Sequence, residues 1–187
     1  MAVIIMGGKF RGRKLATDST SKIIRPTSGK VREALFSSLG GQVQDATFVD
    51  LYAGSGSVGL EAASRGAREV QLVENHPKSW TLLKANVKTV TDDSMEVFSV
   101  HSEVLAFCRK MREAGRTFDI VFADPPFADD FSRLRDVVLG ILVPGGVAII
   151  QFPSRNPPDW LEDAMQAGTA RLKRYGESSL AFLDAIF

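Results

Sequence analysis

From residue 46 onward, short apolar runs alternate with longer segments in which apolar residues recur at helical spacing. The apolar runs are rich in Val, Ile and Phe, which is typical of strands buried on both faces of a parallel sheet. Five such runs are each followed by a helical segment, at 47–53 and 59–66, 69–74 and 77–90, 95–100 and 102–115, 118–123 and 130–142, and 145–152 and 158–168. This alternation predicts βαβ units and an α/β fold.

The two ends of the chain depart from this alternation. Residues 169–187 contain two extended pieces with no helical segment between them, which predicts an antiparallel strand pair at the end of the sheet. Residues 24–40 predict a helix that begins after Thr27 or Ser28 as N-cap and ends before Gly40. We expect this helix to lie beside the sheet.

Length and composition favour one domain. The chain has 187 residues, enough for a sizeable core, and no second block of different composition. We expect a single domain over 1–187, in which residues 1–40 form a basic extension on a core at 46–187. No apolar run reaches the length of a membrane span, and the opening is basic after its apolar piece, which reverses the order of a signal peptide. We therefore expect a cytoplasmic protein with no membrane partner.

Cysteine and histidine content argues against a metal site. The single cysteine, Cys108, excludes internal disulfides and a cysteine-based metal site. It recurs at helical spacing with Val104 and Met111, which favours a core position over a nucleophile. His101 has no second histidine or carboxylate at metal-ligand spacing, so a structural role is favoured and no metal is expected.

Charge is divided unevenly along the chain. Residues 1–40 contain eight Lys or Arg and two acidic residues, whereas the remainder contains 15 and 20. The stretch GGKFRGRK places basic side chains around Phe10, which is typical of a phosphate-binding surface with a stacking ring. A solvated basic hairpin is the alternative, because short basic clusters are common.

The first predicted strand of the core ends in a glycine-rich turn, DLYAGSGSVG, that leads directly into a helix. Gly54 and Gly56 permit a tight turn and the close approach of a ligand, and Gly59 lets the helix pack against the strand. A purely structural turn is the alternative, since glycine-rich turns recur by chance. The next strand ends at Glu74, about twenty residues further on, where a carboxylate can bind both hydroxyls of a ribose.

The acid before this turn bears on the choice of nucleotide. Asp50 stands where a pyrophosphate on the helix start would be repelled, so a dinucleotide is disfavoured. A carboxylate suits a cationic ligand, which favours the ammonium and sulfonium of S-adenosyl-L-methionine over NAD. After the third strand, Ser102 or Glu103 is placed to meet the adenine edge. Glu103 is equally explained as an ordinary acid at the start of a helix.

Residues 122–127, FADPPF, end the fourth strand with an acid, two prolines and an aromatic ring. The prolines stop the strand, hold the backbone stiffly and remove two N–H donors. The Asp124 carboxylate and the Pro125 carbonyl would accept the two N–H groups of an exocyclic base amine, and Phe127 would stack on the base. The alternative is that Asp124 only caps the turn.

These motifs together resemble the bacterial RsmD-like family, the 16S ribosomal RNA guanine-N2 methyltransferases. The resemblance covers nearly the whole chain, through GGKFRGRKL, IRPTSGKVREALFSSL, DLYAGSGSVGLEAASRGA, LVE, DPPF and GESSLAFL. DPPF alone indicates only an amino-methyltransferase for DNA, RNA or protein amide. The basic opening and the RPT–KVREALF segment make the resemblance specific.

The resemblance implies a Rossmann-like class I methyltransferase fold. Its sheet would be seven-stranded and mostly parallel with an antiparallel C-terminal strand pair, and a small hairpin and helix would extend it at the N-terminus. The implied enzyme uses S-adenosyl-L-methionine to methylate the exocyclic N2 amine of a guanine in 16S ribosomal RNA or in a partly assembled small subunit. The chain departs from the family after the third strand, where HSEV replaces the usual small or amide residue.

The resemblance and the positions of the motifs together give three sets of expected site residues. The catalytic motif is Asp124, Pro125, Pro126 and Phe127. The cofactor set is Asp50, Tyr52, Gly54, Gly56, Glu74, Asn75, Ser102 and Glu103. The RNA-binding set is Lys9, Arg11, Arg13, Lys14, Arg25 and Arg32.

Two other functions compete with this one. An amino-methyltransferase acting on another RNA or on DNA would use DPPF equally well, but a DNA enzyme of this chemistry usually carries a separate target-recognition domain, for which the chain has no room. A nucleic-acid-binding module without catalysis is the second alternative. The presence of Asp50, Glu74 and Asp124 argues against such a module.

Overall fold

The computed structural model describes residues 3–17, 28–92, 95–126 and 130–185. It contains two compact units, Met1–Val104 and Leu105–Phe187. The expectation of one domain over 1–187 stays a prediction. No helix in the described part of the chain is both long enough and apolar enough to cross a membrane.

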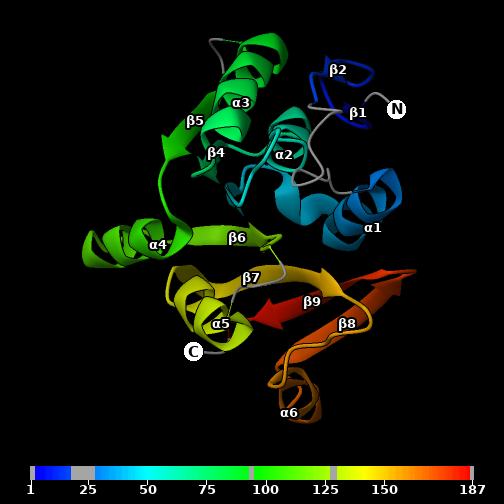
Figure 1. Cartoon of the computed structure of the whole chain (residues 1–187), viewed down its shortest axis with the longest axis vertical. Coiled ribbons are helices and arrows are strands. Elements are labelled where there is room, and N and C mark those ends of the chain that lie inside the picture. The colour runs from blue at the N-terminus through cyan, green and yellow to red at the C-terminus, as the bar shows by residue number, and fades with distance from the viewer. Residues whose placement is uncertain (1–2, 18–27, 93–94, 127–129, 186–187) are drawn as a thin grey trace. The chain divides into compact units, whose positions relative to one another are not determined.

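The main strands form a seven-stranded, mostly parallel sheet, which confirms the predicted α/β fold (Figure 1). In the first unit, β3 (Thr47–Leu51), β4 (Glu69–Glu74) and β5 (Glu96–His101) pair in parallel, with β4 in the middle. Adjacent residues of β4, Leu72 and Val73, point to opposite faces and are both fully buried. This strand is therefore covered on both faces, as its apolar sequence predicts.

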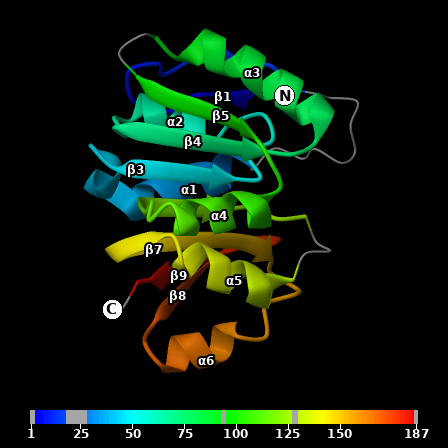
Figure 2. The ribbon, with the colours of Figure 1, turned by 90° about the vertical axis from the view of Figure 1, so that its left-hand side faces the viewer.

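Two helices cover the strands of the first unit. α2 (Gly59–Ser64) packs on β3 and β4, and α3 (Pro77–Val90) packs on β5 (Figure 2). The bounds of α3 agree with the segment that helical spacing predicts. Pro77 stands at its first turn, where the missing N–H has no partner to lose.

The N-terminal extension of the first unit contains the expected hairpin and helix. β1 (Val3–Ile4) and β2 (Lys14–Leu15) form an antiparallel pair, and α1 (Gly29–Leu39) is followed by the 3-10 helix η1 (Gly40–Val43). Ser28 is the N-cap of α1, because its side-chain oxygen accepts the Val31 N–H at 3.3 Å. Thr27, the other candidate cap, lies outside the described residues.

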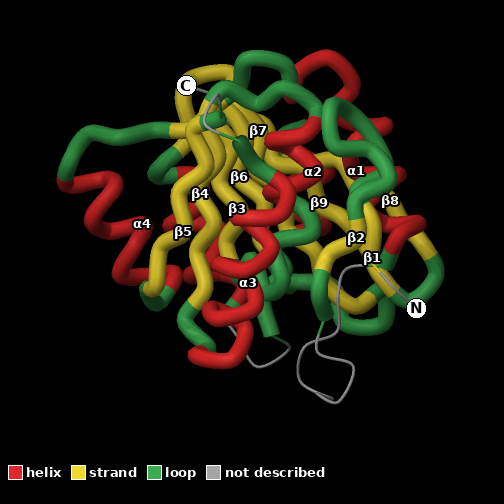
Figure 3. The backbone as a smooth tube through the Cα atoms, turned by 90° about the horizontal axis from the view of Figure 1, so that it is seen from above, coloured by secondary structure: helices red, strands yellow, loops and turns green. Residues whose placement is uncertain are grey.

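The strands of the second unit follow the order β6-β7-β9-β8 (Figure 3). β6 (Phe118–Ala123) and β7 (Leu142–Pro153) are parallel. β9 (Ser178–Asp184) is antiparallel to both β7 and β8 (Ala170–Tyr175). The predicted antiparallel pair near the C-terminus is therefore confirmed.

Three helices accompany these strands. α5 (Phe131–Leu139) packs on β7, α6 (Leu161–Gln166) packs on β8, and α4 (Val104–Glu113) precedes β6. Cys108 of α4 is buried, which confirms its predicted core position. Burial raises the pKa of its thiol to about 12, so this thiol is protonated at neutral pH.

Candidate functional site

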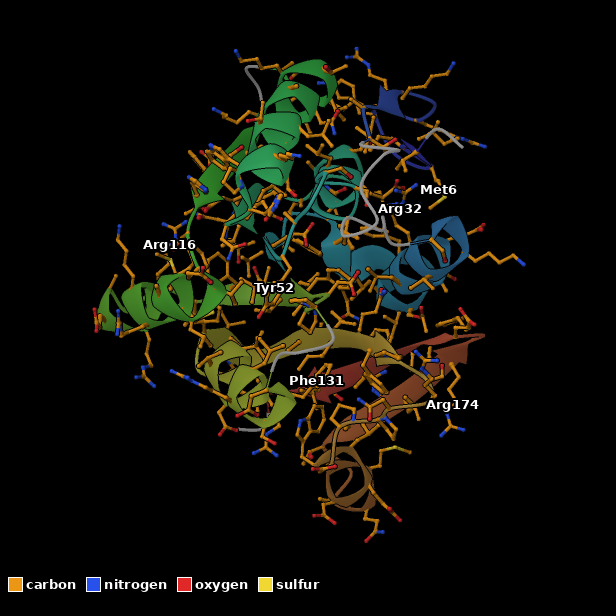
Figure 4. All side chains as sticks on the ribbon, in the orientation of Figure 1. Met6, Arg32, Tyr52, Arg116, Phe131 and Arg174 are labelled. Atoms are coloured by element: carbon orange, nitrogen blue, oxygen red, sulfur yellow. The ribbon has the colours of Figure 1, made fainter. Side chains whose placement is uncertain are left out.

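The loop after β3 has an unusual backbone. Tyr52, Gly54 and Gly56 have positive φ angles of 64°, 56° and 83°, and Tyr52 does so without the freedom of glycine. Hydrogen bonds hold the loop, since Ala53 N–H donates to the Val73 carbonyl at 2.8 Å. Figure 4 labels the Tyr52 side chain. A non-glycine residue in this conformation is typical of functional loops, where the surrounding structure compensates the strain.

Two glycines of this region have no space for a side chain. A Cβ at Gly59 would lie 2.1 Å from Leu72 Cδ2 and 3.1 Å from Asp50 Cβ. A Cβ at Gly56 would lie 2.6 Å from Leu83 Cδ1. The start of α2 therefore packs directly against the strands, as the sequence predicts for Gly59.

Asp50 ties the end of β3 to the start of α2. Its carboxylate is 2% exposed, and Oδ2 accepts the Gly59 N–H at 2.8 Å. This bond satisfies one of the N–H groups that a helix leaves unpaired at its start. Asp50 thus fixes the loop between β3 and α2, and its contact with a cationic ligand stays a prediction.

Glu74, at the end of β4, holds the same loop from the neighbouring strand. Its Oε2 accepts the Gly54 N–H at 2.8 Å, and its Oε1 accepts the His76 N–H at 2.7 Å. An ionised carboxylate has about four acceptor positions, so these two bonds leave capacity for a ribose diol. The spacing predicted the place of Glu74, but the bond to Gly54 follows from the pairing of β3 with β4.

The remaining predicted cofactor residues meet where β4 and β5 end. Asn75 donates from Nδ2 to Glu103 Oε1 at 2.7 Å, and the Ser102 N–H donates to the Glu74 carbonyl at 3.3 Å. Glu103 precedes α4 and pairs with Asn75, which is more than an ordinary acid at a helix start would do. All eight residues of the predicted cofactor set thus lie in the first unit, around the ends of its parallel strands.

His101 has structural partners, in agreement with its predicted role. Its Nε2 lies 2.9 Å from the Asn75 carbonyl oxygen, and its ring stacks on Trp80 with centroids 5.0 Å apart. Among the described residues, no group of three or more His, Cys, Asp or Glu side chains is arranged to hold a metal ion.

The described residues of the predicted catalytic motif, Asp124, Pro125 and Pro126, lie in the second unit, directly after β6. Asp124 is half-buried, Pro125 is buried and Pro126 is exposed, and none of the three belongs to a regular element. The prolines therefore end the strand as predicted. Phe127 lies outside the described residues, and the catalytic roles of the motif stay predictions.

The basic opening is a folded part of the first unit. Met6 N–H donates to Glu61 Oε2 at 2.7 Å, and Phe10 N–H donates to Ser64 Oγ at 2.9 Å. The Ser64 hydroxyl in turn donates to the Gly7 carbonyl at 2.6 Å. These bonds fasten the segment between β1 and β2 to α2.

One expectation for the opening is wrong. Phe10 is only 7% exposed, so it is not a ring on which a base can stack. The Lys9 and Arg13 cations lie 5.5 and 4.8 Å from its centroid. The sequence shows that an aromatic residue lies among cations. It does not show that the ring points into the protein, with two of the cations packed against it.

The charged side chains of the opening differ in their contacts with the rest of the protein. Lys9 Nζ lies 2.7 Å from Asp92 Oδ2, and Arg13 Nη1 donates to the Thr89 carbonyl. Arg11 and Lys14 are exposed. All four cations remain at the surface, so the predicted basic surface exists, with Arg11 and Lys14 the most accessible to a polyanion.

Arg32 does not fit the RNA-binding set. Its side chain is 3% exposed, its Nε lies 3.8 Å from Glu61 Oε2, and its Nη2 donates to the Ile4 carbonyl. Figure 4 shows Arg32 and Met6 close together. Burial lowers the pKa of Arg32, Glu61 opposes this shift, and Arg65 adds to it. Arg32 is thus an internal residue and cannot contact RNA directly, while Arg25 lies outside the described residues.

Sequence reasoning missed Asn86 of α3. Its Oδ1 accepts the Ala16 N–H at 2.8 Å, and its Nδ2 donates to the Ala16 carbonyl at 2.9 Å and to the Ser55 carbonyl at 2.8 Å. It therefore joins the N-terminal extension to the glycine-rich loop. The signal in the sequence is a polar residue on a helix face that also carries Leu83 and Val90.

Comparison with known proteins places the chain in a family. The family described as "Conserved hypothetical protein 95" matches residues 3–184. Ribosomal RNA small subunit methyltransferase D of Escherichia coli (strain K12) is 41% identical over 124 residues, which are 66% of this chain and 59% of that protein. The chain spans about three fifths of the length of the first curated relatives it matches, with 63% and 59% covered.

Solved structures share the fold. A hypothetical protein from Thermus thermophilus is 32% identical, with a TM-score of 0.81 over 97% of this chain and 98% of that one. A T. thermophilus 16S rRNA N2 methyltransferase in complex with AdoMet and guanosine is 24% identical, with a TM-score of 0.68 over 89% of this chain and 44% of that one. The second likeness shows a methyltransferase fold.

The family match extends over the opening, the glycine-rich loop and the Asp-Pro-Pro motif together. The resemblance to the RsmD-like methyltransferases is thereby confirmed, and the chain belongs to the family described as "Conserved hypothetical protein 95".

Proposed function

We propose that this protein is an S-adenosyl-L-methionine-dependent methyltransferase that acts in the cytoplasm on the N2 amine of a guanine in 16S ribosomal RNA. The E. coli relative, whose name assigns it to the RNA of the small subunit, supports this substrate. The proposed substrate is the RNA itself or a partly assembled small subunit.

The observation that carries the proposal is the loop between β3 and α2. Two buried carboxylates hold it at 2.8 Å: Glu74 accepts the Gly54 N–H within the loop, and Asp50 accepts the Gly59 N–H at the start of α2. These bonds hold the loop with Tyr52, Gly54 and Gly56 at positive φ. Such a loop, at the carboxyl ends of parallel strands, is where open α/β folds bind nucleotides.

The residues present fit the proposed cofactor. Glu74 has free acceptor positions for the ribose hydroxyls, and Ser102 and Glu103 stand at the end of the next strand for the adenine edge. The Asp50 carboxylate beside the loop suits the ammonium of the amino-acid part and the sulfonium. S-adenosyl-L-methionine supplies an electrophilic methyl group bonded to a sulfonium.

Asp124 and Pro125 orient the amine of the base and make its nitrogen a better nucleophile. The lone pair of an exocyclic base amine is delocalised into the ring, which makes the nitrogen a poor nucleophile. The Asp124 carboxylate and the Pro125 carbonyl accept its two N–H groups, which holds the nitrogen and favours a pyramidal geometry. As the new N–C bond forms, the methyl carbon–sulfur bond would break and its electron pair would stay on sulfur, leaving a neutral thioether. The nitrogen then loses one proton, and Asp124 accepts it. Catalysis is then largely positioning and electrostatics.

The basic opening binds the RNA backbone. Lys9, Arg11, Arg13 and Lys14 are surface cations on one short folded segment. Because α2 and α3 hold this segment by hydrogen bonds, its cations are presented at fixed places. Contacts of this kind position an RNA and carry no sequence information of their own.

The test uses cells that lack the protein. We expect mass spectrometry of their 16S RNA to show one guanine without its N2 methyl group, and expression of the wild-type chain to restore it. Return of Asp124→Ala serves as the matched control and should leave the guanine unmethylated. Restoration on another RNA or on DNA would replace the proposed substrate, and an unchanged methylation pattern in all strains would refute the proposal.

A further inference from the structure

Gln151 of β7 carries a buried acceptor that no described residue satisfies. Within the described ranges, its Oε1 is buried and has no hydrogen-bond partner. Leaving a buried amide oxygen unpaired is costly, and native proteins pair the great majority of such groups. An exception of this kind calls for an explanation, and an absent ligand that donates a hydrogen bond is one.

The strand register relates Gln151 to Asp124, the first residue of the predicted catalytic motif. β6 and β7 run parallel and adjacent, and their last registered pair is Ala123 with Ile150 (Figure 1, Figure 3). Asp124 lies one residue past the end of β6, and continuing the register by that residue would set it against Gln151. Partners in a parallel pair point to the same face of the sheet, and neighbouring strands are about 4.8 Å apart. This continuation would bring the Gln151 acceptor next to the carboxylate assigned to the amine.

We propose that Gln151 recognises the substrate base, by accepting the ring N1–H that adjoins the reactive amine of guanine. This inference rests on the proposed function and extends it. Asp124 and Pro125 hold the N2 amine, and Gln151 Oε1 holds the next donor along the same edge of the base. The amide Nε2 is then available to donate to O6, which follows N1 on that edge.

The chemistry of the bases explains why an acceptor here selects guanine. In guanine the amine-bearing carbon adjoins a ring nitrogen that carries a hydrogen. In adenine and cytosine the corresponding ring nitrogen is an acceptor, so it would face Oε1 with two lone pairs and no proton between them. A site built to accept a hydrogen bond strongly rejects an analogue that lacks the donor.

A purely structural explanation makes the opposite prediction. If Gln151 were only a packing defect, Gln151→Met, of similar length and without the acceptor, would raise stability and leave turnover unchanged. If it binds the base, the same variant raises or keeps the melting temperature and loses activity. Activity then falls with no fall in stability, which loss of folding cannot produce.

The experiment compares two synthetic 16S fragments that differ only at the target base, guanine or 2-aminopurine. 2-Aminopurine keeps the 2-amine but has an acceptor at N1 and no O6. We expect wild type to prefer guanine at least about 100-fold in kcat/KM, and Gln151→Met to lose about 10- to 100-fold on guanine and most of that preference. S-Adenosyl-L-methionine affinity should stay within twofold, and the melting temperature should not fall.

Two further variants complete the test. Gln151→Glu keeps an acceptor at both positions of the side chain and should retain more guanine activity than Gln151→Met. Gln166→Met, at an exposed glutamine of α6, is the matched control and should change nothing. Wild-type activity on guanine with equal kcat/KM and equal preference in Gln151→Met would overturn this inference alone. Absence of guanine methylation by wild type would instead overturn the proposed function.

Discussion

The glycine-rich loop of the first unit and the end of β7 in the second treat buried polar groups in opposite ways. Asp50 and Glu74 are nearly inaccessible, and their carboxylates are bonded to backbone N–H groups of the loop. Gln151 has a buried oxygen with no partner in the described chain. The first arrangement fixes the conformation of the loop after β3, whereas the second, under the proposed role of Gln151, leaves a bond for a ligand to make. A site can therefore be prepared by satisfying its groups or by leaving one unsatisfied.

The largest expected effect comes from Asp124, beside the unsatisfied group. Asp124→Ala should lower the methyl-transfer rate by about 100- to 10,000-fold, because it removes both the acceptor for the amine and the acceptor for its proton. S-Adenosyl-L-methionine affinity should stay within a few fold. Single-turnover methylation of RNA and calorimetric titration of the cofactor measure the two quantities.

A second variant at this position divides the two roles. Asp124→Asn keeps a hydrogen-bond acceptor without the charge, so substantial activity would show that orientation dominates. A rate as low as that of Asp124→Ala would assign the effect to charge or proton acceptance. A near wild-type rate in folded Asp124→Ala, with only a lower melting temperature, would make Asp124 a turn cap.

Substitution of Glu74 tests the part of the comparison in which the buried carboxylates have hydrogen-bond partners. Glu74→Ala should weaken S-adenosyl-L-methionine binding at least about tenfold, because loss of a hydrogen bond to a charged group costs about 1.5–3 kcal/mol. Glu74→Gln, which keeps one acceptor, should lose less. Calorimetry gives both affinities, and circular dichroism checks that each variant is folded. Equal affinity in wild type and Glu74→Ala would remove the ribose assignment.

Gly59 tests how firmly the loop is fixed. Gly59→Ala places a methyl group 2.1 Å from Leu72 Cδ2, so we expect overpacking to cost about 1–3 kcal/mol in the free energy of unfolding. Gly29→Ala is the control, because a Cβ there meets nothing within 4 Å. Urea unfolding of both variants measures the difference. Equal free energies of unfolding for Gly59→Ala and Gly29→Ala would show that the loop and α2 can shift to make room for the methyl group.

The smallest effect is expected from the exposed cations of the opening. Replacing Arg11 and Lys14 together by Ala should weaken RNA binding several-fold and reduce its salt slope by up to about two charges. Cofactor affinity should not change. Lys110→Ala, at an exposed lysine of α4, is the control. Filter binding over a range of salt concentrations measures the slope, and an unchanged slope would make the opening a solvated hairpin.

The elements could be predicted well because periodicity reports burial directly. Residues 77–90 and 118–123 match α3 and β6 to the residue, since each has a pure helical or strand pattern between clear boundaries. β7 begins at Leu142, three residues before the predicted start at 145, because Pro144 reads as a break in the chain before the strand. Backbone pairing with the neighbouring strands overrides that local preference.

The errors in the candidate site have a different cause. Phe10 lies in the basic stretch GGKFRGRK, which is typical of RNA-binding surfaces, and Arg32 lies in α1 of the same basic extension, yet both are buried. Their burial depends on α2, because Glu61 faces Arg32 and Ser64 holds the Phe10 backbone. Likewise, Gln151 belongs to no motif in the sequence. Only the packing around it shows that its oxygen has no partner among the residues that the structure describes. Composition identifies charge and ring, but not the direction in which a side chain points.

The attachment of the basic opening also governs how the chain acquires its structure during synthesis. Its anchoring bonds join Phe10 to Ser64 and Ala16 to Asn86, which are 54 and 70 positions apart. At translation rates of about 5–20 residues per second, the ribosome needs roughly 3–14 seconds to make those partners. During that interval the opening has neither helix to dock on, and its cations and Phe10 are exposed together. The basic opening is therefore synthesised before α2 and α3 but can dock only after both have been made.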